Sequence, residues 1–116
     1  SGAQLRQVLE QQWLNQPRAR PLQLSQGFRY TWDAARPVGQ RVLPESMQLH
    51  GQTLQAETRY RVTVSSFLAA GGDGFPAFTA GTERRTGVMD IEALVHHLQS
   101  QPLTRPAALD RVHRLN

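Results

Sequence analysis

The glycine-rich stretch from residue 67 to residue 78 constrains the fold of this chain more than any other feature. Gly71, Gly72 and Gly74 lie within four residues, with Asp73 among them. Glycine tolerates positive φ and lets a backbone come close to a ligand. The stretch therefore predicts a tight turn, one that ends any regular element and holds the aspartate at a fixed angle.

Aromatic residues flank this turn. Phe67 precedes it and Phe75 follows it, so the two rings are placed to wall a small cavity. The alternative is an ordinary turn without a ligand, because Asp-Gly is a common turn dipeptide. On composition alone, both interpretations stay open.

A strand is predicted just before the turn. Tyr60, Val62 and Val64 alternate with polar residues, which is the mark of a half-buried strand. Such a strand delivers Phe67 and the glycine turn at its C-terminal end. Loops at strand ends are where α/β proteins usually place ligand groups.

The rest of the chain indicates two main helices. Ser1 and Gln4 predict a capping box for a helix over about Ala3 to Leu14, before a proline-containing loop. The second helix is amphipathic, with Asp90 as its N-cap and its end near Ser100. Its apolar positions follow helical spacing: Ile91, Leu94, Val95 and Leu98.

Alternating apolar residues indicate further strands. One begins at Leu22, with an irregularity at Gln26-Gly27 and an aromatic face. Another resumes at Arg41 and ends in a tight reversal over residues 50–52, and residues 109–115 predict a final edge strand. The fold class is therefore mixed α/β (α+β), a mixed sheet of roughly four to six strands with two main helices. Residues 1–116 form a single domain or part of one, and the abrupt, helix-like start is typical of an excised domain.

Charge and composition exclude several function classes. The chain has 13 basic residues, all of them arginine, and a net charge of +4. The arginines are scattered and not interleaved with aromatic residues, so no nucleic-acid surface is predicted. There is no cysteine, hence no disulfide or thiolate metal site. No signal pattern and no membrane-spanning apolar run are present.

Catalytic groups are also missing. A metal-assisted phosphatase needs several Asp, His or Asn ligands, and no Asp-x-His or Gly-Asn-His-Glu cluster occurs. His50 lies at a predicted turn, and the adjacent His96 and His97 point apart on a helix. No serine lies in a nucleophile elbow. We therefore predict no catalytic and no metal-binding residue in this chain.

The stretch from Tyr60 to Phe75, YRVTVSSFLAAGGDGF, closely resembles the C-terminal-domain signature of the 5'-nucleotidase / UDP-sugar hydrolase / 2',3'-cyclic-nucleotide phosphodiesterase family. Residues 1–5, 22–30, 39–42 and 90–98 also fall in the family's order. The resemblance covers nearly the whole chain. It implies the later part of a substrate-binding C-terminal domain, a fragment of a larger domain whose N-terminal metallophosphatase domain is absent.

In that family a base is sandwiched between two phenylalanines, and an aspartate of the glycine loop accepts from the ribose hydroxyls. The matching positions are Phe67 and Asp73. The glycines at 71, 72 and 74 are assigned to loop geometry and close backbone approach, and Phe75 to packing against the sheet. The Pro-Phe-Gly-Asn motif that carries the first phenylalanine is absent here, so the chain holds half of the base clamp.

The resemblance implies a parent enzyme that is a phosphoric ester hydrolase acting on a nucleotide. Two divalent metal ions are expected in the missing domain, with none in this chain, which alone is expected to be inactive. Family members are usually periplasmic or on the cell surface. The alternative is a non-catalytic module whose arginines bind an acidic protein or polysaccharide. Surface left open in the fragment also predicts dimerisation.

Overall fold

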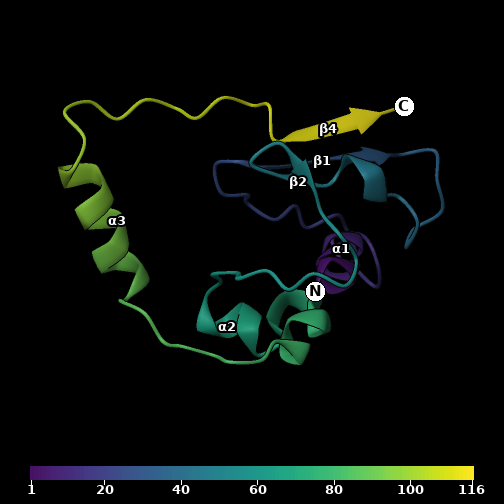
Figure 1. The fold of residues 1–116 in the computed structure, drawn as a ribbon, viewed down its shortest axis with the longest axis horizontal. Coiled ribbons are helices and arrows are strands. Elements are labelled where there is room, and N and C mark those ends of the chain that lie inside the picture. Colours follow the sequence, from purple (N-terminus) through teal and green to yellow (C-terminus); the bar gives the residue numbers. More distant parts are fainter.

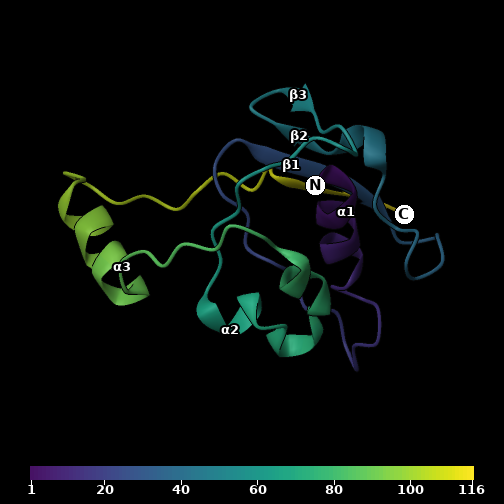
Figure 2. The same ribbon diagram turned by 60° about the horizontal axis from the view of Figure 1, so that its bottom comes forward.

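The computed structural model describes all 116 residues and shows a small sheet with one helix packed on it (Figures 1 and 2). The sheet has four strands in the order β3-β2-β1-β4. The strands are β1 (Phe28–Asp33), β2 (Gln48–Leu49), β3 (Gln52–Thr53) and β4 (Val112–Leu115). The sheet is mixed, because β1 pairs antiparallel with β2 and parallel with β4.

Helix α1 (Gly2–Glu10) begins with the predicted capping box, since Ser1 and Gln4 exchange hydrogen bonds. It ends four residues earlier than predicted. Residues 11–15 form turns, and the amides of Gln12 and Trp13 donate to carbonyls three residues back. Asn15 then takes a left-handed backbone conformation with φ of 56°, which stops a helix.

The core lies between α1 and the inner face of the sheet. Its buried members are Leu9 of α1, Tyr30 of β1, and Val42 and Met47 from the segment between β1 and β2. Partly buried apolar side chains pack around them: Leu5, Trp13, Leu24, Phe28, Trp32 and Leu54. Because alternate residues of β1 share a face, the aromatic stripe predicted from the sequence is the face that meets α1.

Two stretches predicted as strand form none. Of the strand predicted from Leu22, the part after Gln26-Gly27 is β1, whereas its first part is irregular. Residues 22–24 form no strand, because their backbone groups bond to side chains: the Leu22 amide donates to Gln12 Oε1 at 2.8 Å, and Arg111 donates to the Leu24 carbonyl. Residues 60–65 form no strand because no other segment of this chain pairs with them. The predicted reversal at residues 50–52 is confirmed: it is the β2–β3 turn, with positive φ at His50 and Gly51.

The second half of the chain is mostly short helices. Helix α2 (Ser66–Ala69) is followed by 3₁₀ turns over Gly72–Gly74 and Pro76–Ala80. Helix α3 (Asp90–Gln99) lies apart from the sheet, between two long irregular segments of the chain (Figures 1 and 2). Its N-cap is Met89, one residue before the predicted Asp90. The chain then returns to the sheet as β4, the predicted edge strand.

Candidate functional site

The glycine loop follows α2 directly and is built from left-handed backbone. Gly71 and Gly74 have φ of 86° and 78°, values that favour glycine. Asp73 itself has φ of 55°, inside the 3₁₀ turn. The loop therefore reverses within a few residues and fixes the direction in which the Asp73 side chain leaves the backbone.

Phe67 lies on α2 with its ring over the loop. The residue is 59% exposed, although phenylalanine usually prefers the interior. A Cβ atom added to Gly72 would lie only 2.5–2.6 Å from three atoms of this ring. The ring therefore rests on the bare Cα of Gly72, and this glycine is required for the close approach.

The Asp73 carboxylate is held from a distant part of the chain. Arg20 donates to Asp73 Oδ1 at 2.5 Å, and about half of each side chain is exposed. Gln16 Nε2 donates to the Asp73 carbonyl at 2.8 Å and to the Gly74 carbonyl at 3.4 Å. The segment after α1 thus anchors both the backbone and the side chain of the loop.

Gln16 and Arg20 were not identified from the sequence. They lie 57 and 53 residues before Asp73, in a stretch that showed only the proline signal of a loop. The spacing of the pairs follows from the packing of the loop beside the end of α1, and no local pattern carries it. Arg20 is one of 13 arginines, and no sequence motif indicated that this one contacts the loop.

Phe75 differs from Phe67 in its surroundings. Its side chain is buried, with 2% exposure, and its ring centroid lies 6.2 Å from that of Phe78. Close by, the Ala77 amide donates to Gln11 Oε1. Phe75 therefore supports the loop from below, and only Phe67 of this pair presents a ring face to solvent.

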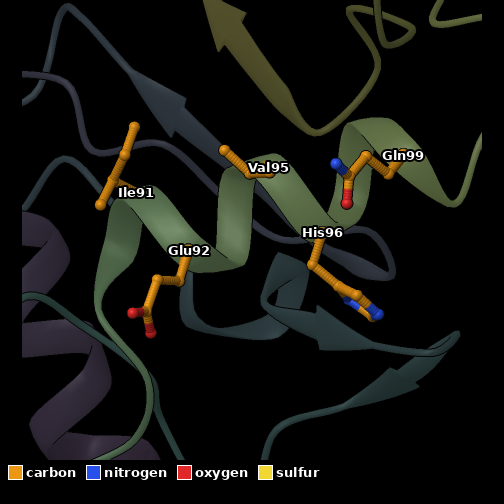
Figure 3. A pocket seen from close by; sticks show the side chains of 5 residues that line it. All are labelled: Ile91, Glu92, Val95, His96 and Gln99. Carbon is orange, nitrogen blue, oxygen red and sulfur yellow. The ribbon is translucent and has the colours of Figure 1, made fainter.

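Two hollows of the molecule lie away from this loop. One, of about 260 Å³, is lined by residues of α3 alone, which makes it an open helix face (Figure 3). The other, of about 330 Å³, lies beside β1 and β4 and is lined mainly by polar side chains. Neither is lined by Phe67 or Asp73.

The chain offers no group of three or more His, Asp or Glu side chains placed to hold a metal ion. The aspartate of the loop faces an arginine, which is the opposite of a cation site. The residues present therefore do not fit a divalent metal ion, and the resemblance places the two expected ions in the N-terminal domain. None of the helices has the length and apolar content needed to cross a membrane.

Several arginines are engaged within the fold. Arg41 lies over the rings of Trp13 and Trp32, at 5.6 and 6.0 Å from their centroids. Arg114 lies 5.4 Å from the Trp32 centroid. Cation–π contacts of this kind place the flat guanidinium over an aromatic ring. These two arginines therefore pack on tryptophan rings at the surface of the sheet.

The groups with shifted pKa values belong to the sheet. Burial raises the pKa of Tyr30, whose hydroxyl accepts from Gln12 Nε2 at 2.8 Å. Hydrogen bonds lower the pKa of Asp33, first from the Asn116 side chain at 3.1 Å and then from the Ala35 amide at 2.9 Å. Both residues lie on β1.

Comparison with known proteins gives a consistent family. A family model described as "5'-nucleotidase, C-terminal domain" matches residues 1–80. An apyrase of Aedes aegypti is 33% identical over 109 residues, which is 84% of this chain and 19% of that protein. A 5'-nucleotidase of Vibrio cholerae is 43% identical over 51 residues, 43% of this chain and 9% of that protein.

A solved structure agrees over the whole chain. It is that of a 5'-nucleotidase precursor from Thermus thermophilus, with a TM-score of 0.80 and 32% sequence identity. The match covers 100% of this chain and 24% of that chain. The present chain thus spans about a quarter or less of the length of these relatives.

Proposed function

The chain belongs to the family of 5'-nucleotidase C-terminal domains, and on that premise we propose that it supplies base and ribose recognition to a larger phosphohydrolase, its parent protein. Phe67 stacks on the base, and Asp73 accepts hydrogen bonds from the ribose hydroxyls. The glycines at 71, 72 and 74 shape the loop, and Phe75 supports it. The substrate would be a nucleotide.

The observation that supports this proposal is the pairing of an exposed ring with an exposed carboxylate on one loop. Phe67 rests on Gly72, and Asp73 is the next residue. An aromatic face stacks on any base, with about 1–3 kcal/mol per base. A carboxylate only accepts hydrogen bonds, which suits two neighbouring hydroxyls.

Arg20 positions the carboxylate for this role. It engages Oδ1 of Asp73, and no side chain or amide of the chain donates to Oδ2. One oxygen is therefore anchored while the other is free to accept from a hydroxyl. The charge-assisted bond to the guanidinium also restricts the directions that the carboxylate can take.

The chemistry of phosphate release lies outside these residues. We assign the divalent metal ions and the nucleophile to the metallophosphatase domain of the parent protein, because this chain has no ligand cluster for a metal. Within the parent, this chain binds and orients the nucleoside, so that the phosphate reaches the other domain. We also propose that the parent is exported to the periplasm or cell surface; the Thermus relative is called a precursor.

Calorimetric titration of the parent protein with adenosine and AMP tests the assignment. Phe67→Ala should weaken adenosine binding by roughly 5- to 150-fold, the equivalent of one lost stacking contact. Phe67→Trp should retain it. Asp73→Asn should weaken adenosine more than 2',3'-dideoxyadenosine, because only adenosine presents the hydroxyls.

Asp90→Asn is the matched control, since Asp90 is an exposed aspartate on the distant helix α3. Unchanged adenosine binding in both Phe67→Ala and Asp73→Asn contradicts the proposal. Binding that instead weakens steeply with salt in all variants favours the arginine-driven module, because exposed charges are screened by salt and stacking is not.

A further inference from the structure

Residues 60–65 hold the pattern of a strand and lack the pairing of one. Tyr60, Val62 and Val64 alternate with polar side chains, which matches a pleated, half-covered surface. Tyr60 and Val64 are partly buried, while Val62 is 47% exposed. The side chains are arranged for a sheet, yet the segment belongs to none.

The backbone of this segment is unsatisfied. None of the amide or carbonyl groups of residues 60–64 forms a hydrogen bond with any other group of the chain. Backbone groups in folded proteins are almost always paired, and an extended segment with a free row of donors and acceptors is a template for another strand.

The loop over residues 83–88 shows why the pattern matters. Its backbone groups are also unpaired within the chain. Its sequence, Glu-Arg-Arg-Thr-Gly-Val, has no alternation of apolar residues. Water can satisfy such a polar loop, whereas the alternating side chains of residues 60–65 gain from a neighbouring strand.

We propose that residues 60–65 are a strand completed by a β-strand of the same polypeptide outside these 116 residues. The partner strand would lie beside residues 60–65, which directly precede α2 and the loop that carries Phe67 and Asp73. This inference rests on the larger parent protein of the proposed function, and is independent of the nucleoside contacts. In this arrangement the missing strand fixes the base of the recognition loop.

The parent chain is the occupant that the observations favour. This chain aligns over its full length with 24% of the Thermus protein, so most of a relative's chain lies outside the matched part. A second copy fits less well. Residues 58–72 hold Arg59 and Arg61 with no acidic residue, so self-pairing would bring four arginines together between two chains of net charge +4.

Helix α3 shows a second open surface of the same kind. Ile91 and Val95 project from one side of the helix, away from Glu92 and His96 (Figure 3). With Leu94 and Leu98, these side chains form an apolar stripe that is 43–57% exposed. A stripe of this kind usually faces a core. Two surfaces of these 116 residues, the segment 60–65 and the apolar stripe of α3, are therefore suited to pack against another part of the parent polypeptide.

Residue-resolved hydrogen–deuterium exchange on the ligand-free parent protein tests the pairing. Because neighbouring amides of a strand point to opposite edges, at least every second amide of residues 60–65 should be protected. We expect those amides to exchange ~100-fold or more slowly than the amides of residues 83–88, after correction for intrinsic rates. Strand β1, which is paired on both sides, is the positive control.

Exchange in residues 60–65 as fast as in residues 83–88 overturns the inference. Protection that rises with protein concentration also overturns it, because the partner is then a second copy. Two single variants, Val62→Pro and Thr63→Pro, add a check. Only the variant whose proline replaces an amide that faces the partner strand should abolish protection of the neighbouring amides. Exchange in the presence of AMP is a separate measurement. If AMP gives no added protection at residues 67–75, the result contradicts only the proposed nucleoside binding and leaves the strand pairing intact.

Discussion

The contact between Phe67 and Gly72 allows a mutation that moves the ring without removing it. Gly72→Ala introduces a Cβ atom 2.5–2.6 Å from the ring atoms, which is too close for any real contact. Gly72 does not have positive φ, so alanine fits its backbone. Because the ring is exposed and at the end of a flexible side chain, it should swing away while the loop stays folded.

The expected magnitude follows from the stacking contact. A displaced ring loses the base, which is about 1–3 kcal/mol, or roughly 5- to 150-fold in the adenosine dissociation constant. The assay is calorimetry on the parent protein, with circular dichroism to show that the fold is kept. Gly87→Ala is the matched control, because a Cβ there meets nothing within 4 Å and its φ is not positive.

A double-mutant cycle decides whether the ring carries the effect. In a Phe67→Ala background the clash has no partner, so Gly72→Ala should cost nothing further. Two losses that add in full would show that Gly72 acts through the backbone, and would refute the argument. Wild-type affinity in Gly72→Ala would refute it as well, because the observed ring position would then be irrelevant to binding.

Three further predictions concern stability, measured by urea unfolding. Arg20→Gln should change the unfolding free energy by less than ~1 kcal/mol, because both partners of the Arg20–Asp73 bridge are about half exposed; a larger loss would mean a structural role for the bridge. Phe75→Ala should cost about 3–5 kcal/mol, since the ring is buried, whereas Phe67→Ala should cost far less; equal costs would contradict the assigned roles. The raised pKa of Tyr30 means that the folded chain keeps the phenol proton longer than the unfolded chain. The contribution of Tyr30 to the unfolding free energy should therefore be fully present below about pH 10 and be lost as the pH rises toward the folded pKa. Tyr30→Phe should remove this decrease of stability at alkaline pH. An unchanged decrease would mean that another group causes it.

Local signals predicted local structure well. The Ser1–Gln4 capping box, the reversal at residues 50–52, the second helix and the final edge strand each follow from side-chain chemistry or periodicity within a few residues. The mixed α/β fold and the family also follow from such patterns. Errors arose where a segment's partner was not local, as at residues 22–24, whose backbone bonds to Gln12 and Arg111.

The sequence by itself determined the left-handed turn around Asp73, because glycines at positions 71 and 74 permit positive φ whatever surrounds them. Only the tertiary structure decided that Phe67 lies over Gly72, that Phe75 is buried, and that Gln16 and Arg20 hold the loop from more than fifty residues away. The physical reason is that backbone conformation is set by neighbouring residues, whereas burial and long-range hydrogen bonds depend on which surfaces the fold brings together. The segment at residues 60–65 shows the same division: its alternating pattern is local, and no segment of these 116 residues pairs with it.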